Sequence, residues 1–313
     1  RTAVCCLSSL NLEKYDEWKD NKNFVEDIMR FLDNVMTDFI DRAPDSFKDA
    51  KYSAMRERSV GLGVMGLHSY FQQKGIPFGS VMSKVWNKKV FKDIQEKADA
   101  ASVSLAEERG ACPDAEDYGI KERFSNKTAI APTASISIIC GGTSPGIEPI
   151  AANSYTHKTL SGSYNVRNKY LAKILEKHGK NDDETWSSIT TNQGSVSHLD
   201  FLTDDEKETF KTAFEIDQRW IIDFGADRTP YISQAQSINV FIPADIHKKE
   251  LHNIHFQAWK KGLKSLYYCR SKSIQRAENI NAGSSTDVTK SVYNKDKVSS
   301  NETSNYEECL SCQ

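Results

Sequence analysis

The chain has 313 residues, of which 38% are hydrophobic and 27% are charged, a composition typical of a globular protein with a sizeable core. Its 41 basic and 43 acidic residues give a formal net charge of −2, which argues against nucleic acid and anionic membranes as partners. No run approaches about 18 apolar residues, so we expect no membrane-spanning helix. The sequence starts at Arg1 in what reads as a strand, and we expect it to be a piece of a longer protein.

Four helices are expected from apolar residues at helical spacing. They cover residues 23–40, 85–109, 167–178 and 204–224, and the last three each precede a glycine that would end the helix. The side chains expected to face inward from the first helix are Phe24, Ile28, Phe31, Leu32, Val35 and Phe39. Those expected to face inward from the last are Phe210, Phe214, Ile216, Trp220, Ile221 and Phe224.

Short β-rich runs alternate with these helices. They are "TAVCCLSSL" (2–10), "KTAIAP" (127–132), "ISII" (136–139), "SINVFI" (237–242) and "SLYYC" (265–269). This alternation predicts an α/β fold with mainly parallel strand pairing.

The last part of the chain, from Ser271 to Glu308, is poor in apolar residues and rich in Asn, Ser, Thr, Lys, Asp and Glu. Such a composition cannot bury enough surface to offset the entropy of ordering. We therefore predict a folded domain over residues 1–270 and a flexible, disordered tail over residues 271–313.

The tail carries two cysteines, Cys309 and Cys312, in a C-x-x-C pair. Because no histidine lies nearer than His255 and there is no second C-x-x-C, the pair reads as an exchangeable dithiol rather than half of a zinc site, and we predict no metal centre. The seven cysteines form an odd set without a secretion signal, which favours free thiols in a reducing compartment, and we expect a cytoplasmic protein.

Three further motifs have both an ordinary and a functional interpretation. "GLGVMG" (61–66) matches a dinucleotide-binding pattern, but charged residues precede it and no acid follows at the required distance, so we favour a loop packed against a following helix. "APTASISI" (131–138) is either a loop that binds an anion through backbone amides and hydroxyls or a strand with Ser/Thr turns. The adjacent Tyr267 and Tyr268 are either core residues with a hydrogen bond or carriers of one-electron chemistry.

Taken together, the motifs resemble the large, catalytic subunit of class I ribonucleotide reductase. The matching segments follow the family's order and span nearly the whole chain: "AVCCLSSLNL", "RSVGLGVMGLHSYF", "ERGACP", "APTASISIICGGTSPGIEP", "NQGSV", "SQAQSINVFI", "WKKGLKSLYYCR" and "CLSCQ". The resemblance implies the later half of a ten-stranded α/β barrel, followed by a C-terminal tail.

The resemblance also implies roles for individual residues. Cys5 matches the thiol that enters a disulfide when the ribose is reduced, whereas Cys6 is not at a redox position. Tyr267 and Tyr268 match a stacked pair that passes an oxidising equivalent to the active site, and Cys309 and Cys312 match the dithiol that re-reduces the disulfide. The segment matching the loop that holds the substrate diphosphate consists of Pro132, Thr133, Ala134, Ser135 and Ile136, the last at a position where many relatives carry a hydroxyl.

One departure from the family is large. The hydrogen-abstracting cysteine of the family lies in an Asn-x-Cys-x-Glu segment, and no cysteine here has that setting. We expect this segment, the second disulfide-forming thiol and the nucleotide effector sites to lie upstream of Arg1. The chain would then need a complementing polypeptide, and as an isolated half-barrel with exposed edges it should self-associate or aggregate.

The resemblance further implies a ribonucleoside diphosphate as substrate and no cofactor bound directly. A small subunit with a di-iron tyrosyl radical would supply the oxidising equivalent, and thioredoxin or glutaredoxin would be the reductant. The alternative is a non-catalytic half-barrel that binds or regulates reductase subunits.

Overall fold

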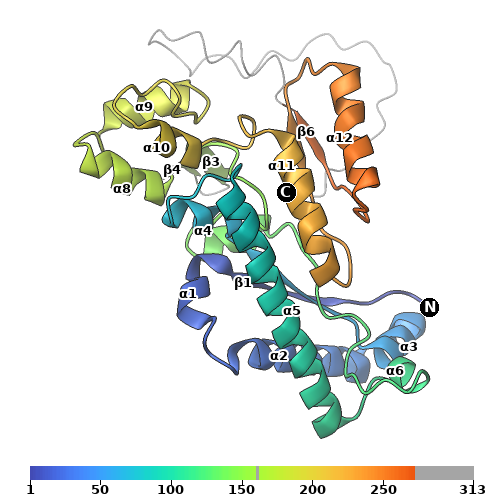
Figure 1. Cartoon of the computed structure of the whole chain (residues 1–313). Helices are drawn as coiled ribbons and strands as arrows, with labels where there is room; N and C mark the ends of the chain where they lie inside the picture. The colour runs from blue at the N-terminus through green and yellow to red at the C-terminus, as the bar shows by residue number, and fades with distance from the viewer. Residues whose placement is uncertain (160–161, 272–313) are drawn as a thin grey trace, which may run out of the picture.

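The computed structural model describes residues 1–159 and 162–271, and the predicted tail over 271–313 lies almost entirely outside them. Figure 1 shows the arrangement of the elements. The strands are β1 (Cys6–Asn11), β2 (Val60–Met65), β3 (Ser154–Thr159), β4 (Gly162–Arg167), β5 (Val240–Ile242) and β6 (Cys269–Ser271). The α-helices are α1 (Tyr15–Trp18), α2 (Phe24–Arg42), α3 (Lys48–Glu57), α4 (Leu67–Gln73), α5 (Val81–Arg109), α6 (Pro113–Glu116), α7 (Ala134–Ile139), α8 (Lys169–Lys177), α9 (Asp183–Thr191), α10 (Asp204–Thr209), α11 (Gln218–Arg228) and α12 (Lys248–Lys260).

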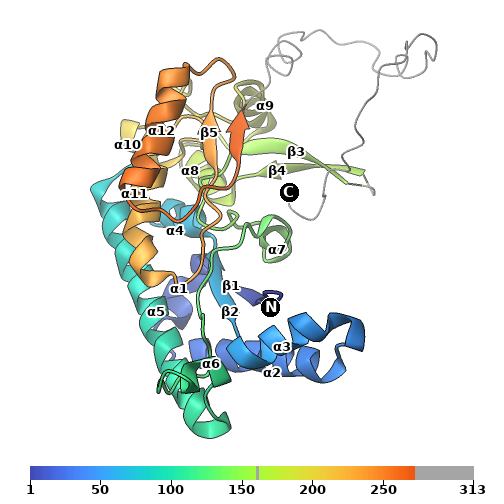
Figure 2. The same ribbon diagram turned by 90° about the vertical axis from the view of Figure 1, so that its right-hand side faces the viewer.

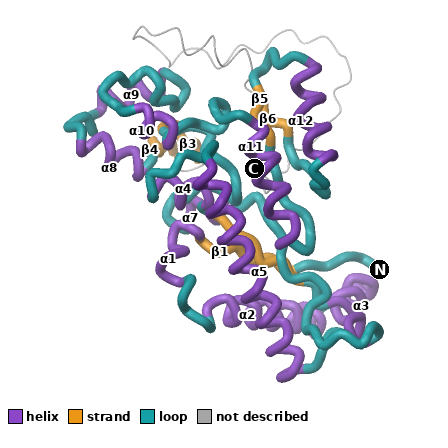
Figure 3. Tube along the Cα trace, in the orientation of Figure 1, coloured by secondary structure: helices purple, strands orange, loops and turns teal. Residues whose placement is uncertain are grey.

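Five extended segments lie side by side in chain order, and all pairs are parallel. β1 pairs with β2, and β2 is bridged on its other edge to the segment 127–130 through Leu62 and Thr128. Ile130 is bridged in turn to Gln236, and the strand that continues from there pairs as β5 with β6. The two parallel pairs, joined through the bridged segment, therefore form an open parallel α/β half-barrel, which confirms the predicted fold class. Figure 3 shows the strands in orange among the helices.

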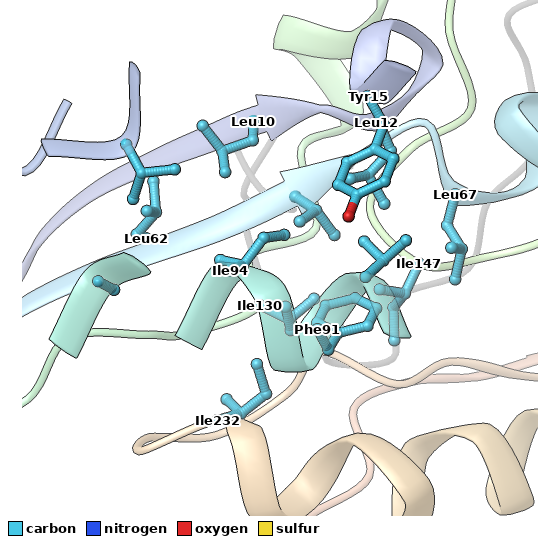
Figure 4. Close-up of a cluster of buried hydrophobic side chains, with 14 of the residues drawn as sticks. Leu10, Leu12, Tyr15, Leu62, Leu67, Phe91, Ile94, Ile130, Ile147 and Ile232 are labelled. Atoms are coloured by element: carbon cyan, nitrogen blue, oxygen red, sulfur yellow. The ribbon is translucent and has the colours of Figure 1, made fainter. Parts of the chain in front are cut away.

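Helices cover one face of these strands, as Figure 2 shows for α5, α11 and α12, while α7 and the β3–β4 hairpin lie on the other side. The core fills the space between helices and strands. In Figure 4, Ile94 of α5 faces Leu10 of β1 and Leu62 of β2, and Phe91 lies farther along the same helix next to Ile130. All of these side chains are buried. A second, smaller apolar cluster joins α8, α9 and α10.

The long helix α5 has the boundaries that its sequence favours. Ser80 precedes it, and the Ser80 hydroxyl accepts a hydrogen bond from the backbone N–H of Ser83 at 3.1 Å in a capping box. Gly110 follows its last residue with a positive φ of 86°. The expected helix over 85–109 is thus confirmed and begins one turn earlier.

The prediction of which residues of the first helix face the core is wrong in part. Phe31 and Val35 are 59% and 39% exposed. The buried apolar residues of α2 are instead Val25, Met29, Leu32 and Met36. Helix α2 carries two sets of apolar residues at helical spacing. The set that contains the unbranched side chains Met29 and Met36 is the one buried in the core.

The helix expected over residues 204–224 is interrupted. α10 ends at Thr209, and α11 starts only at Gln218, because the intervening backbone is held by tertiary hydrogen bonds. The N–H of Ala213 donates to Ile150 O at 2.7 Å, and the Gln218 side chain donates to the carbonyls of Ala213 and Ile216. Gly225 lies inside α11 rather than after it.

Three other segments differ from expectation. "ISII" is helical in α7, and "GLGVMG" contributes the buried strand β2 rather than a loop. The antiparallel hairpin of β3 and β4 was not expected. None of the described helices combines the length and apolar character needed to cross a membrane.

Candidate functional site

The segment after the third parallel strand turns sharply into α7. Thr133 adopts a left-handed conformation (φ 56°, ψ 24°), and its hydroxyl accepts a hydrogen bond from the N–H of Gly146 at 2.7 Å. No side chain caps the start of α7, so the N–H groups of its first turn have no partner within the helix. This geometry favours the anion-loop interpretation over the strand with Ser/Thr turns.

A pocket of about 280 Å³ lies against this turn, and we call it the loop pocket. It is lined by Leu7, Ser8 and Ser9 of β1, by residues 131–136 and by Tyr267. All five residues predicted to hold a phosphate, Pro132, Thr133, Ala134, Ser135 and Ile136, are therefore in its wall. Tyr267, more than 130 residues away in sequence, reaches the same pocket.

Cys5 lies immediately before β1 and is exposed. Side chains alternate along an extended chain, so Cys5 shares a face with Leu7 of the loop pocket. Its Sγ accepts a hydrogen bond from Gln234 Nε2 at 3.3 Å, and Gln234 also donates to Val60 O at 2.9 Å. Gln234 was not singled out from the sequence, because only the folded strands bring it to Cys5.

The absence of a side chain at Gly61 leaves space for the thiol of Cys5. A Cβ at this position would lie 3.3 Å from Cys5 Sγ and 2.5 Å from Leu7 Cδ2, so any side chain would disturb this face. The glycine of "GLGVMG" thus shapes the surroundings of the thiol. Cys6 points the other way, towards the core, and burial together with the nearby Cys5 raises the pKa of its thiol.

Tyr267 and Tyr268 form a ring pair just before β6. Their centroids are 4.1 Å apart with an interplanar angle of 53°, and the residues are 40% and 45% exposed. The interpretation of both tyrosines as core residues is therefore wrong. The ladder is irregular at this point, because the N–H of Tyr268 donates to the side chain of Asn239 (Oδ1, 2.9 Å) rather than to a main-chain carbonyl.

Glu148, which sequence reasoning missed, is a buried carboxyl that interacts with Asn239 and Arg270. Burial raises its pKa to about 7, against the opposing effects of a hydrogen bond from Asn239 and the positive charge of Arg270. The Arg270 guanidinium lies 5.8 Å from the centroid of the Tyr268 ring. The motif "GIEP" contains this residue, but nothing local to it signals burial.

Other predicted site residues are separate from this region or lie outside the described residues. Cys309 and Cys312 fall in the undescribed part of the chain. Among the other cysteines of the described residues, Cys112 is buried, whereas Cys140 and Cys269 are exposed. Within residues 1–159 and 162–271, no group of three or more His, Cys, Asp or Glu side chains is placed to hold a metal ion.

Comparison with known proteins identifies the family. The profile described as "Ribonucleotide reductase, barrel domain" matches residues 1–122 and 114–269. The chain belongs to the ribonucleotide reductase family. A ribonucleoside-diphosphate reductase large subunit of Invertebrate iridescent virus 6 is 48% identical over 98% of this chain and 33% of its own length, and one of Caenorhabditis elegans is 32% identical over 86% and 38%.

Structural comparison agrees with the sequence match. The class Id ribonucleotide reductase alpha subunit of Actinobacillus ureae superposes with a TM-score of 0.81 at 40% identity, over 88% of this chain and 51% of that protein. The chain thus spans about a third to a half of the length of these reductases.

Proposed function

We propose that this chain is the C-terminal component of a class I ribonucleotide reductase large subunit, acting in the radical reduction of ribonucleoside diphosphates. The observation that carries the proposal is the convergence of the 132–136 turn, Tyr267 and the Cys5 face of β1 on one pocket. The family match supports the same assignment.

The substrate diphosphate binds in the loop pocket. The N–H groups at the start of α7 and the hydroxyl of Ser135 donate to its oxygens, and Thr133 holds the turn in shape through Gly146. Ile136, at 42% exposed, lines the pocket without a hydroxyl of its own. The positive end of the short helix favours the anion.

The chemistry requires a second chain. A complementing polypeptide with the Asn-x-Cys-x-Glu segment removes the 3′ hydrogen of the ribose as an atom, the 2′ hydroxyl leaves as water, and the same hydrogen atom returns to C3′ at the end of the cycle. Two thiols, Cys5 and one from the complementing chain, supply two electrons and two protons and become a disulfide. The tail dithiol of Cys309 and Cys312 exchanges with this disulfide and is itself reduced by thioredoxin or glutaredoxin.

The oxidising equivalent enters through Tyr267 and Tyr268. A small subunit with a di-iron tyrosyl radical supplies it, and at each step one phenol gives an electron and a proton to its oxidised neighbour. The ring separation of 4.1 Å supports direct transfer between the two residues. Nucleotide effectors bind to the upstream region, and the assembly works in the cytoplasm.

The test combines purified chain, an upstream large-subunit fragment from the 48%-identical viral relative, and that virus's small subunit. Formation of deoxyribonucleoside diphosphate is measured with a dithiol-protein reductant. Tyr267→Phe and Tyr268→Phe should each abolish turnover, while Tyr118→Phe, at an 84% exposed position, should not. Normal turnover in either relay variant would refute the relay assignment.

The thiols have their own test. Cys5→Ser should abolish product formation, whereas a Cys309→Ser/Cys312→Ser double variant should give about one round of product per site and then stop. Co-purification from source cells followed by mass spectrometry should recover a polypeptide with the Asn-x-Cys-x-Glu segment. Recovery of reductase subunits without such a polypeptide would favour a non-catalytic binding module instead.

A further inference from the structure

The side-chain amide of Gln234 presents a hydrogen-bond donor to the thiol of Cys5. Gln234 Nε2 lies 3.3 Å from Cys5 Sγ and 2.9 Å from Val60 O, and it donates to both. A backbone carbonyl can only accept, so Val60 requires the NH₂ end of the amide at this place. The carbonyl therefore fixes which end of the amide faces the sulfur, and that end is the donor.

The backbone of Gln234 is tied to its neighbours on both sides. Its N–H donates to Thr128 O at 3.0 Å, and its own carbonyl accepts from Lys264 Nζ at 2.9 Å. The preceding residue, Ser233, donates to Thr128 from its N–H, to Oγ1 at 2.9 Å, and from its hydroxyl, to the carbonyl at 3.1 Å. The amide that reaches Cys5 thus starts from a backbone with little freedom.

Lys264 holds the segment 232–234 as a whole. Its ammonium donates to three successive carbonyls, of Ile232 at 3.2 Å, Ser233 at 2.6 Å and Gln234 at 2.9 Å. An ammonium has three hydrogens to donate, so this set of acceptors uses all of them. Lys264 therefore fixes the course of the chain from which the Gln234 side chain extends.

We propose that Gln234 acts on the Cys5 sulfur directly, as the donor that stabilises its thiolate, and that Lys264 is the positioning residue that holds Gln234 in place for this contact. The inference rests on the thiol role given to Cys5 above, and it adds the group that controls the reactivity of that thiol.

The chemical reason is the difference between a thiol and a thiolate as acceptors. A thiol sulfur is a weak acceptor, whereas hydrogen bonds to an ionised acceptor are about twice as strong as those between neutral groups. The contact from Gln234 therefore favours the thiolate over the thiol. The thiolate is the form of a cysteine that reacts.

The same contact favours one direction of disulfide exchange. When a thiolate of the tail attacks the sulfur of the complementing chain, a new S–S bond joins these two, and the bond to Cys5 breaks. The electron pair of the broken bond stays on Cys5 Sγ, where Gln234 donates to it, and the thiolate then takes a proton from water. Since a stabilised thiolate leaves faster, the disulfide should open with Cys5 as the leaving group.

The experiment measures the reactivity of Cys5 in the full chain, kept dilute and fully reduced. The chain is alkylated at pH 7.5 with iodoacetamide, an uncharged reagent, for a series of times, and peptides are quantified by mass spectrometry. Fragment ions separate Cys5 from Cys6 in their shared peptide. The exposed Cys140 in the same sample is the internal reference.

A graded pair of substitutions tests the donor. Gln234→Met keeps an unbranched side chain of similar length without a donor, and we expect it to lower the alkylation rate of Cys5 about twofold, because the loss of thiolate is partly offset by the greater nucleophilicity of an unbonded one. Gln234→Glu places a negative charge against the thiolate and should lower the rate about fivefold. The rate at Cys140 should stay the same in both.

Lys264 and a control position complete the design. Lys264→Met should lower the rate at Cys5 about twofold, whereas Lys264→Arg keeps a cationic donor and should restore the wild-type rate. This pair also decides the question if the Gln234 variants fail to fold. Gln95→Met makes the same replacement at a half-buried position of α5 and should change nothing.

The inference is overturned if Gln234→Met leaves the rate at Cys5 unchanged or raises it, or if Gln234→Met and Gln234→Glu lower it equally, as a purely structural residue would. The alkylation rates do not depend on reductase activity. The expected series of rates in a complemented enzyme that forms no deoxyribonucleotide would therefore reject the proposed function alone, and normal turnover without the series would reject the role of Gln234 alone.

Discussion

Replacing Asp33 with asparagine should destabilise the chain more than any exposed charge removal on the same helix. The Asp33 side chain is fully buried in α2, and three guanidiniums donate to it: Arg58 Nε at 2.8 Å, Arg109 Nη1 at 2.8 Å and Arg123 Nε at 2.9 Å. These arginines come from the end of α3, the end of α5 and the loop after α6. One carboxylate therefore joins three segments to α2.

The expected loss of stability follows from the buried arginine charge that Asp33→Asn leaves without a partner. Removing one partner of a buried ion pair typically costs about 3–5 kcal/mol, because the remaining charge is uncompensated. Arg58 is the deepest of the three, with 9% of its side chain exposed, so we expect Asp33→Asn to lower the free energy of unfolding by about 3 kcal/mol.

Asp38 on the same helix provides the matched control. Its pair with Arg42 is exposed, at 60% and 80% of the side chains, so Asp38→Asn should cost no more than about 0.5 kcal/mol. The assay is urea unfolding followed by far-ultraviolet circular dichroism at pH 7. Equal effects of the two substitutions would refute the reasoning.

The pH dependence supplies an independent check on Asp33. Burial acts to raise the pKa of this carboxyl, but the hydrogen bond from Arg123 and the charge of Arg58 lower it overall. The stabilisation is therefore present above the unfolded pKa of about 3.9 and is lost as the pH falls below it. The difference between wild type and Asp33→Asn should shrink in this acid range.

Three further substitutions test the packing around the site. Gly63→Ala should lower the free energy of unfolding by about 1–3 kcal/mol, measured by urea unfolding, since its Cβ would lie 2.3 Å from Ala129 O and push β2 from its neighbour. Thr133→Val should cost about 1 kcal/mol in the same assay, by removing the acceptor of Gly146, and should raise KM for the diphosphate in the complemented enzyme. Burial raises the pKa of Glu148 from 4.5 to about 7. The free energy of unfolding should therefore fall by about 3 kcal/mol as the pH rises from 4.5 to 7, because the folded protein must give up a proton that it holds more tightly than the unfolded chain does. Thermal melts of Glu148→Gln should lack this pH dependence.

Patterns that are local in sequence predicted much of the fold. The α/β class and the end of α5 follow from apolar periodicity and from a glycine at the helix end, and both are confirmed. Such signals are strong because they depend on residues within a few positions of one another. The local pattern of residues 131–138 left an anion loop and a strand both open; the segment 132–136 was singled out by the family resemblance, and the structure brings its residues to one pocket.

The errors arise where distant contacts decide the outcome. The break between α10 and α11 depends on Ile150, some 60 residues away, which accepts from Ala213. The backbone at Tyr268 likewise depends on a distant residue, because its N–H donates to the side chain of Asn239, 29 residues earlier. No periodicity within a short window contains this information.

The placement of the candidate site follows from how a parallel sheet is covered. Parallel strands are normally buried on both faces, and here Val60, Leu62 and Val64 of β2 are buried against the helical layer. The opposite face carries Cys5 and Leu7, which is 55% exposed, and Gly61 adds no side chain that would press on them. The thiol, the loop pocket and Tyr267 therefore lie on the side of the strands that this helical layer leaves open.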